Sequence, residues 1–395
     1  MTTHTSRSAP TVGIVSTYPP TTCGLATFSF SLRRAMCQLR GSDSEMPVVS
    51  VVDTVSDIRP EVIHQHLNGD SDSLASAVDK LNSCDVVLIQ HEYGIYGGAD
   101  GAEVLDLIEG LSVPTIVTLH TIPHNPTARQ KAILESIVAT TDQTIVMSNA
   151  ASLRLVSRYD LDPSKVRIIP HGANPDLAGP RLVKSGRPLV LSWGLIGPGK
   201  GLETAIAAFA QLSDVTPRPR YVILGDTHPK VKATQGDSYL EGLAAQAEES
   251  GVSDMVEFDH RYLDSESLIE MIHSVDFILV PYDSREQATS GVLVEAIAAG
   301  KPVVATAFPH AVEILSTGAG IVVPQKDPAA MAEAMRRLFT DEDLAEQMAA
   351  TATSIGATMY WPTVAASYEA LASELARERV HAGGGSEMAG ITRIA

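Results

Sequence analysis

The chain has 395 residues, of which 44% are hydrophobic and 19% are charged, and its formal net charge is −18. A chain of this length is too long for one ordinary hydrophobic core, so the sequence predicts two or three globular domains. The acidic balance excludes nucleic acid and other polyanions as principal partners, because binding them requires clustered Lys and Arg. It also disfavours contact with a membrane.

The cysteines and the first residues indicate a reduced, cytoplasmic protein. Cys23, Cys37 and Cys84 have unrelated spacings and match neither a disulfide framework nor a metal-binding motif. The opening segment M-T-T-H-T-S-R-S-A-P is polar and lacks the apolar stretch of a secretion signal. The apolar runs along the chain are far shorter than the roughly 20 residues that a membrane span requires. We therefore expect a cytoplasmic location.

Short apolar runs rich in β-branched residues alternate with helical patterns, and these runs predict strands. In the first half they cover residues 12–16, 48–52, 86–90, 115–119, 144–147 and 166–169. In the second half they cover residues 189–192, 221–224, 255–258, 277–280, 303–306 and 320–323. Strands that are apolar along their whole length and separated by helices are typical of parallel sheets covered on both faces. The sequence therefore predicts an α/β protein.

The segment 170–188 divides the two series of strands. It is rich in Pro and Gly and weakly patterned, which predicts a linker between two doubly wound, Rossmann-like domains, 1–180 and 186–360. We expect these domains to face each other across a cleft. Residues 379–395, with glycines at 383–385, predict a flexible tail. Ligands of open parallel sheets bind beyond the carboxyl ends of the strands, so the loops after strands should carry the chemistry.

Loops in the first domain contain several candidate contacts. After residues 12–16 comes T-Y-P-P-T-T-C-G, where Gly24 would let the backbone approach a phosphate or sugar; the alternative is a plain turn. His91, Glu92 and His120 follow predicted strands, as does His228 in the second domain, and each could contact a sugar or acceptor. A structural role is the alternative for each histidine. No histidine pair has the spacing of a helical zinc site, so we predict no metal.

The glycine-rich loop G-L-I-G-P-G-K-G follows residues 189–192 and nearly matches a P-loop. Gly199 and Lys200 fit the motif, but Gly201 stands where Ser or Thr must hold Mg²⁺, which disfavours a nucleotide-hydrolysing P-loop. A lysine that neutralises a diphosphate without a metal is the prediction, and a solvated lysine on a tight turn is the alternative. Asp70-Ser71-Asp72 resembles a metal-binding D-x-D but follows no predicted strand, so we interpret it as a solvated turn.

Residues 287–306, Q-A-T-S-G-V-L-V-E-A-I-A-A-G-K-P-V-V-A-T, are the most informative stretch. They predict a short helix that opens at Ser290 and Gly291 and stops at Gly300. The start of such a helix presents free N–H groups and a positive dipole end, which suit a phosphate. Glu295 lies one turn inside, and its carboxylate can lean back toward the same point. A phosphate site beside a carboxylate for sugar hydroxyls describes a site for a nucleoside diphosphate.

Together these motifs resemble the retaining glycosyltransferases of glycosyltransferase family 4, which have the two-domain GT-B fold. The resemblance runs from about residue 12 to residue 368. It rests on P-P-T-T-C-G, L-H-T, I-P-H-G, G-K-G-L-E and L-V-E-A-I-A-A-G-K-P-V-V-A-T. The late M-Y-W-P-T-V-A-A-S-Y resembles the final helix of the family, which would place residues 361–378 back on the first domain.

The resemblance implies transfer of a hexose, of glucose or mannose type, from a nucleoside-diphosphate sugar to a hydroxyl acceptor. Retention of configuration and independence of metals and cofactors are implied as well. By position, Glu295 would bind the ribose, and Lys200 with the loop at Gly199 would hold the diphosphate. The backbone amides that would share this task lie near Ser290, Gly291 and Val292.

Gly24 would face the phosphates from the first domain, and His120 would lie near the transferred sugar. Two positions depart from the family pattern: Gln287 stands where a glutamate is common, and Leu195 where an arginine often occurs. An amide donates and accepts hydrogen bonds, so we expect Gln287 to keep the contact with sugar hydroxyls. Lys200 would then carry more of the charge neutralisation.

These departures motivate an alternative, a catalytically impaired module that binds nucleotide-sugars. A sugar-nucleotide epimerase of the same architecture is a further alternative. The sequence does not indicate which base and sugar the donor carries. It also does not indicate the acceptor, the linkage or the oligomeric state.

Overall fold

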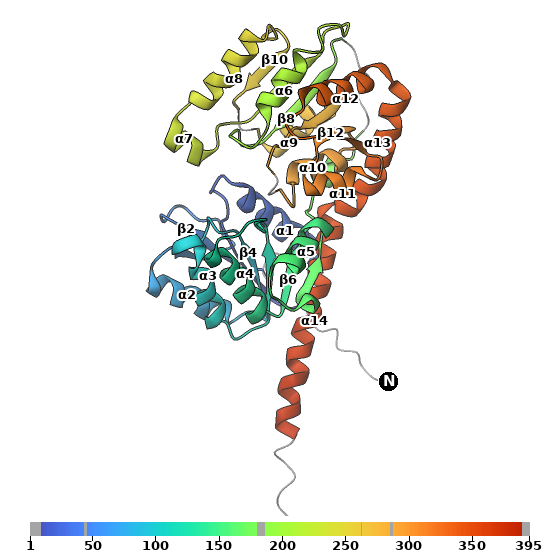
Figure 1. Ribbon diagram of the computed structural model, residues 1–395. Helices are drawn as coiled ribbons and strands as arrows, with labels where there is room; N and C mark the ends of the chain where they lie inside the picture. The colour runs from blue at the N-terminus through green and yellow to red at the C-terminus, as the bar shows by residue number, and fades with distance from the viewer. Residues whose placement is uncertain (1–8, 43–45, 180–185, 262, 285–286, 389–395) are drawn as a thin grey trace, which may run out of the picture. The chain divides into compact units, whose positions relative to one another are not determined.

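The computed structural model describes residues 9–42, 46–179, 186–261, 263–284 and 287–388. It divides into two compact units (Figure 1). The first unit comprises Met1–Gly172 and Trp361–Ala395, and the second comprises Ala173–Tyr360. The boundary therefore lies between Gly172 and Ala173, inside the segment predicted as a linker rather than at residue 180.

The first unit contains a seven-stranded sheet of order β3-β2-β1-β4-β5-β6-β7, and all its strand pairs are parallel. The strands are β1 (Val12–Ser16), β2 (Val48–Val52), β3 (Val62–Leu67), β4 (Val86–His91), β5 (Thr115–Leu119), β6 (Gln143–Val146) and β7 (Val166–Ile168). The helices are α1 (Gly24–Arg40), α2 (Ser71–Leu81), α3 (Glu103–Gly110), α4 (Ala128–Thr140), α5 (Asn149–Arg158) and α14 (Trp361–Met388), with short turns η1 (Ala99–Gly101) and η2 (Pro163–Lys165).

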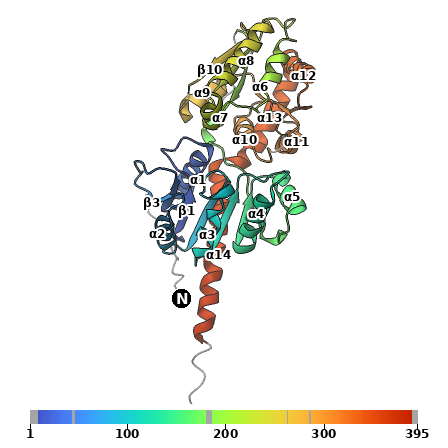
Figure 2. The same ribbon diagram turned by 60° about the vertical axis from the view of Figure 1, so that its left-hand side comes forward.

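Helix α14 returns the chain to the first unit and packs with α1 on one face of its sheet (Figure 2). Its buried residues recur every three or four positions, which is the spacing of one helix face. They are Trp361, Val364, Ala365, Tyr368, Leu371, Ala372 and Leu375. The Tyr368 hydroxyl lies 3.0 Å from the Thr118 hydroxyl of β5. The guanidinium of Arg40 lies 2.7 Å from the carboxylate of Glu369. Burial of each large apolar side chain here contributes about 1.5–3 kcal/mol.

The second unit contains a six-stranded parallel sheet of order β10-β9-β8-β11-β12-β13. Its strands are β8 (Leu189–Trp193), β9 (Arg220–Leu224), β10 (Val256–Asp259), β11 (Phe277–Val280), β12 (Val303–Thr306) and β13 (Gly320–Val323). Its helices are α6 (Leu202–Phe209), α7 (Pro229–Gln235), α8 (Ser238–Glu249), α9 (Ser265–Ser274), α10 (Gly291–Ala298), α11 (Pro309–Leu315), α12 (Pro328–Thr340) and α13 (Glu342–Gly356), with short turns η3 (Pro175–Leu177) and η4 (Ala357–Met359).

Helices cover both faces of the second sheet, which gives the unit two apolar cores. One core joins α6, α8 and α12 to the sheet, and the other joins α9, α10 and α11. The prediction of two doubly wound α/β domains is therefore confirmed. The strand order reverses between β1 and β4 in the first sheet and between β8 and β11 in the second. Loops at such reversals lie side by side and form the usual ligand site of this architecture.

Two sequence predictions in the first unit are corrected. Strand β3 was not expected, because V-I-H-Q-H-L is an edge strand with polar side chains and only two of its residues are buried. Asp70 does not lie in a solvated turn. Its carboxylate caps α2 by accepting hydrogen bonds from the N–H groups of Asp72 and Ser73. An N-terminal cap of this kind explains the acidic residues without a metal.

The carboxyl end of α14 also differs from expectation. Residues 379–388 were predicted to belong to a flexible tail, but α14 continues through them to Met388. The segment A-R-E-R-V-H-A before the glycines consists mostly of good helix formers, which carry the helix forward. Residues 389–395 of the predicted tail lie outside the described residues. Within the described ranges, no helix is both long enough and apolar enough to cross a membrane.

Candidate functional site

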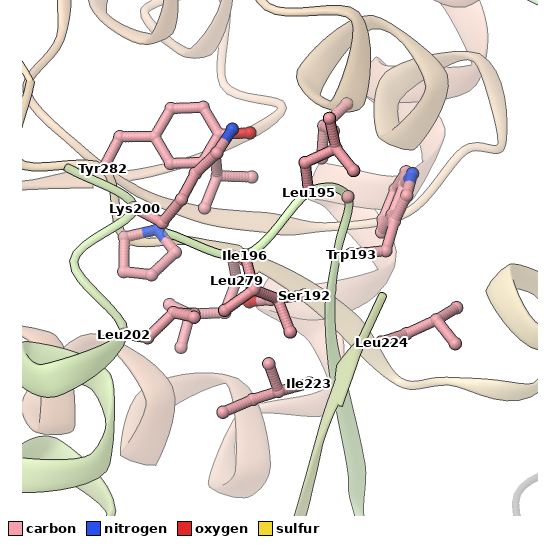
Figure 3. Close-up of a pocket in the computed structure, with 14 residues that line it drawn as sticks. Ser192, Trp193, Leu195, Ile196, Lys200, Leu202, Ile223, Leu224, Leu279 and Tyr282 are labelled. Carbon is pink, nitrogen blue, oxygen red and sulfur yellow. The ribbon is translucent and has the colours of Figure 1, made fainter. Parts of the chain in front are cut away.

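A pocket that opens to solvent lies at the carboxyl ends of β8 and β11 in the second unit (Figure 3). Its empty space, with the open solvent at its mouth included, is about 320 Å³. Its lining is mostly aliphatic and aromatic: Ser192, Trp193, Gly194, Leu195, Ile196, Lys200, Leu202, Ile223, Leu224, Leu279, Val280, Pro281, Tyr282 and Val292. Among these described residues, Lys200 is the one that carries a positive charge. The pocket therefore lies at the reversal of strand order and combines apolar walls with one cation.

The loop between β8 and α6 is shaped by glycines. Gly199 and Gly201 have φ angles of +90° and +67°. A Cβ at position 201 would lie 1.9 Å from the carbonyl oxygen of Pro281, so only glycine fits against the loop after β11. The Asp283 N–H also donates to the Gly199 carbonyl at 3.1 Å. These contacts hold the two loops together and place Lys200 between them.

We expect Gly201→Ala to destabilise the second unit strongly, because the added methyl group meets backbone rather than a side chain that could move. The left-handed conformation adds a cost of about 1–2 kcal/mol. The Tm of the variant, measured by calorimetry, should fall by several degrees. Gly242→Ala is the control, since it lies in α8 with no atom within 4 Å of the added Cβ. That change should stabilise the protein, and an equal loss in both variants would contradict the steric account.

The ammonium group of Lys200 lies over an aromatic ring at the pocket. Its Nζ is 4.4 Å from the centroid of the Tyr282 ring. Figure 3 shows the Lys200 side chain crossing that ring. A cation over the face of a ring is held by the negative charge density of that face. No carboxylate in the described part of the chain forms an ion pair with Lys200. Its charge is therefore available to an anionic ligand.

Helix α10 begins beside the pocket with two backbone amides that lack protein acceptors. Ser290 caps the helix, because its hydroxyl accepts from the Leu293 N–H at 3.2 Å. The Ser290 N–H is occupied by Nδ1 of the buried His310, at 2.9 Å. The N–H groups of Gly291 and Val292 have no acceptor among the described residues. This helix start can therefore receive the oxygen atoms of a phosphate.

Glu295 lies one turn into α10 and is linked to the pocket wall by Trp193. The indole Nε1 of Trp193 donates to Oε2 of Glu295 at 3.2 Å. Burial raises the pKa of the Glu295 carboxyl group to about 7, although the Trp193 hydrogen bond acts in the opposite direction. The group therefore lies close to its ionisation midpoint at neutral pH, and hydrogen-bond donors from a ligand would favour its charged form.

The remaining predicted residues of the second unit lie nearby. The side-chain amide of Gln287 donates to the carbonyl of Thr289 within the same loop, which leaves its Oε1 as the atom for a ligand. Leu195 lines the pocket, so an apolar group stands where the family often has a cation. His228 does not line the pocket, but its N–H donates to the carbonyl of Ile196, which does.

In the first unit, His120 follows β5 and faces the side of the sheet that α1 and α14 cover. Its Nε2 lies 2.8 Å from Oε1 of Gln90, and its ring contacts Phe28 with centroids 4.7 Å apart. Burial lowers the pKa of His120 to about 3, with further lowering by His171 and His91. The ring is therefore neutral at physiological pH.

His91 does not occupy the position expected of a sugar contact. His91 is the last residue of β4; its side chain is completely buried, and its ring stacks on Tyr96 with centroids 6.4 Å apart. The predicted sugar contact is corrected for this residue, because β4 runs one residue further than expected and turns the side chain inward. Glu92 accepts the Gly94 N–H at 2.6 Å and so organises its own turn.

Gly24 is the first residue of α1, and open space surrounds the point where a Cβ would stand. Cys23 precedes it and caps the helix, with Sγ 3.4 Å from the Ala26 nitrogen. This start of α1 lies after β1, at the reversal of strand order in the first sheet. Among the described residues, no group of three or more His, Cys, Asp or Glu side chains is arranged to hold a metal ion.

The fold and the pocket define a class of protein with two Rossmann-like units, one of which has a site suited to a nucleoside diphosphate. Two family models match consecutive parts of the chain: "Glycosyltransferase Family 4" over residues 48–177 and "Glycosyl transferases group 1" over residues 176–354. The chain belongs to these GT-B glycosyltransferases, which are enzymes that transfer sugars.

Similar curated proteins are named D-inositol 3-phosphate glycosyltransferase. The protein of Stackebrandtia nassauensis is 30% identical over 241 residues, which are 58% of this chain and 53% of that protein. The protein of Corynebacterium jeikeium is 29% identical over 310 residues, which are 72% of each chain. The chain thus spans about half the length of the first relative and more of the second.

Solved structures share the fold at low sequence identity. A glycosyltransferase from Rickettsia africae has a TM-score of 0.75 and 16% identity over 93% of this chain and 98% of its own. HepE of Anabaena in complex with UDP has a TM-score of 0.73 and 16% identity over 92% of this chain and 100% of its own.

Proposed function

We propose that the chain is a retaining hexosyltransferase that moves a glucose-type or mannose-type sugar from a nucleoside-diphosphate sugar to a hydroxyl acceptor. The observation that carries the proposal is the grouping of Lys200, the free amides of Gly291 and Val292, and Glu295 around one apolar pocket. The names of the curated relatives and the UDP and UDP-glucose complexes of HepE support it.

Each part of the pocket matches one part of such a donor. The ammonium of Lys200 and the amides at the start of α10 would bind the diphosphate, which carries the negative charge. The carboxylate of Glu295 would accept hydrogen bonds from the ribose hydroxyls. The apolar wall that includes Trp193 and Leu195 offers surface for the flat face of a base.

The transfer itself requires a bond from the anomeric carbon to the diphosphate to break and a bond to the acceptor oxygen to form. Among the described residues that line the pocket, no carboxylate stands as a nucleophile. We therefore propose front-face attack, in which an oxygen of the departing diphosphate takes the proton of the acceptor hydroxyl. Lys200 and the helix amides stabilise the charge that builds on the diphosphate, so no metal or cofactor is needed.

The first unit supplies the acceptor side of the proposed reaction. Gly24 at the open start of α1 would approach the phosphates, and the neutral His120 would contact the transferred sugar. Glu92, His228 and Gln287 remain candidate contacts for sugar hydroxyls. A cytoplasmic site of action completes the proposal and agrees with Cys23, Cys37 and Cys84, which form no disulfide with one another, since thiols stay reduced there.

A thermal-shift screen with UDP, GDP and ADP, each with and without Mg²⁺, tests the binding site and selects the base. We expect one nucleotide to raise the Tm by several degrees without Mg²⁺, through its preference for the folded state. The matching nucleotide-sugars are then incubated with the protein and the products are separated. Release of free nucleoside diphosphate supports transferase chemistry. Binding without donor consumption indicates an impaired module, and an isomerised sugar without acceptor indicates an epimerase.

A further inference from the structure

We propose that Gln90 is a positioning residue that fixes the tautomer of His120 and directs its Nδ1 lone pair toward the transferred sugar. The inference rests on the proposed function, which places His120 beside that sugar. It deepens the proposal by assigning a role to a residue of β4 that the sequence presented only as the polar end of an apolar strand.

Strand alternation brings the two side chains together. Successive side chains of a strand point to opposite faces, so Gln90 shares the face of Val86 and Leu88, which belong to the core beneath α1 and α14. His91 points to the other face. The His120 N–H donates to the His91 carbonyl at 3.0 Å, which holds the ends of β4 and β5 in register. The backbone thus places the Gln90 amide against the His120 ring.

The hydrogen bond determines which ring nitrogen carries the proton. Oε1 of Gln90 is an acceptor and lies 2.8 Å from Nε2 of His120, so Nε2 carries the hydrogen. Burial keeps the ring neutral, and a neutral imidazole has one donor nitrogen and one acceptor nitrogen. Nδ1 is then the acceptor. It can receive a hydrogen bond from a sugar hydroxyl but cannot donate one.

The surroundings of Gln90 indicate that its amide serves this contact rather than stability. The residue is completely buried, and its Nε2 has no partner among the described residues. A buried donor without an acceptor costs about 1–3 kcal/mol. An unbranched apolar side chain would fill the same space at the end of an otherwise apolar strand without that cost. Gln90 therefore costs folding free energy at the position that orients His120.

The ring of His120 contacts Phe28, and Phe28 in turn packs against Trp361. The Phe28 ring meets the His120 ring edge to face at 4.7 Å between centroids, and Trp361 packs against Phe28 at 5.1 Å. Among the described residues, Gln90 is the one hydrogen-bond partner of the His120 ring, so Gln90 selects the tautomer. Loss of the Gln90 Oε1 atom should allow both tautomers of His120 to form, while the His120 ring stays close to its present position.

Gln90→Met and Gln90→Glu test the inference, with Gln65→Met as the control, because Gln65 lies on the edge strand β3. Nitrogen NMR of histidine-labelled protein reports the tautomer of His120 without any ligand. We expect the Nε2–H form in the unmodified chain, a mixture of tautomers in Gln90→Met, and the Nε2–H form again in Gln90→Glu, whose carboxylate also accepts. The Gln65→Met spectrum should match that of the unmodified chain.

Donor consumption provides the second measurement, using the nucleotide-sugar chosen by the thermal-shift screen. Gln90→Met should lower kcat about tenfold or more through misplacement of the sugar, with donor KM nearly unchanged and Tm equal or higher. A fall in Tm with a proportional loss of activity would show a merely structural role. Unchanged kcat, or an unchanged tautomer in Gln90→Met, would overturn the inference. Absence of turnover in the unmodified chain, with the NMR result as expected, would instead contradict the proposed function.

Discussion

Lys200→Ala should lower kcat for donor turnover by about 10²- to 10³-fold while leaving the fold intact. This is the usual effect of removing one group that stabilises charge in a transition state. Lys200 carries the positive charge of the pocket lining, and Leu195 occupies a position where a second cation is common in the family. No other residue of the described pocket lining carries a positive charge that could substitute. The loop should keep its shape, because its glycines and the contact between Gly201 and Pro281 define it.

Steady-state kinetics with the selected nucleotide-sugar measures the effect, and circular dichroism checks the fold. Arg337→Ala is the matched control, since it removes one positive charge from the exposed face of α12 in the same unit. Lys200→Arg separates charge from geometry: it should restore part of the activity. Wild-type turnover in Lys200→Ala would remove this residue from the mechanism.

Glu295→Gln should weaken binding of the nucleoside diphosphate by about tenfold or more, because hydrogen bonds to a charged group contribute about 1.5–3 kcal/mol. The loss should depend on pH. The pKa of the unliganded carboxyl group is about 7, and the ribose hydroxyls favour its ionised form. Affinity of the unmodified chain should therefore rise as pH increases through 7. The affinity of the Glu295→Gln variant should lack the part of this rise that comes from ionisation of the carboxyl group.

Titration calorimetry at several pH values measures the difference. The terminal phosphate of the ligand ionises in a similar pH range, so it contributes to the pH dependence of affinity in both proteins. The contribution of Glu295 is therefore the difference between the curve of the unmodified chain and the curve of Glu295→Gln. Glu266→Gln, on the exposed surface of α9, is the control for loss of one carboxylate. Parallel pH curves for the unmodified chain and Glu295→Gln would contradict the assigned role.

The same carboxyl group affects the stability of the unliganded protein in the opposite sense. Its pKa is raised in the folded state, from an ordinary value of 4.5 to about 7. Between these values the folded chain binds a proton that the unfolded chain has lost, so stability falls as pH rises through that window. The Glu295→Gln variant has no carboxyl group at this position, so its stability should not fall in this way as pH rises. It should therefore have the higher Tm at pH 8 and show little difference below pH 4.5.

The sequence predicted the sheets well because their strands are buried along both faces. Strands β1 and β11 were predicted to the residue, since every residue of V-G-I-V-S and F-I-L-V is buried. The start of α10 was also predicted correctly, because Ser290, Gly291 and the apolar residues that follow them form a local signal for the start of a helix. Local patterns of this kind depend on the neighbours in sequence alone.

The contacts that tune the site depend on residues far apart in the chain, and single-sequence reasoning missed them. His310 accepts the Ser290 N–H from twenty positions away, and Trp193 reaches Glu295 from the end of another strand. The Gln90 contact with His120 requires that β4 and β5 be neighbours in register. A polar residue ending a wholly apolar strand was the signal that could have drawn attention to Gln90. The inward turn of His91 had no comparable signal, because it depends on one extra strand residue.

The return of α14 to the first unit sets an order for assembly during synthesis. The second unit is continuous in sequence, so it can close its cores as soon as Tyr360 has left the ribosome. The strands of the first sheet are synthesised earlier. The part of this sheet that packs against Tyr368 and Leu371 nevertheless stays uncovered until α14 has been synthesised. The half of the protein that is translated first is therefore completed last.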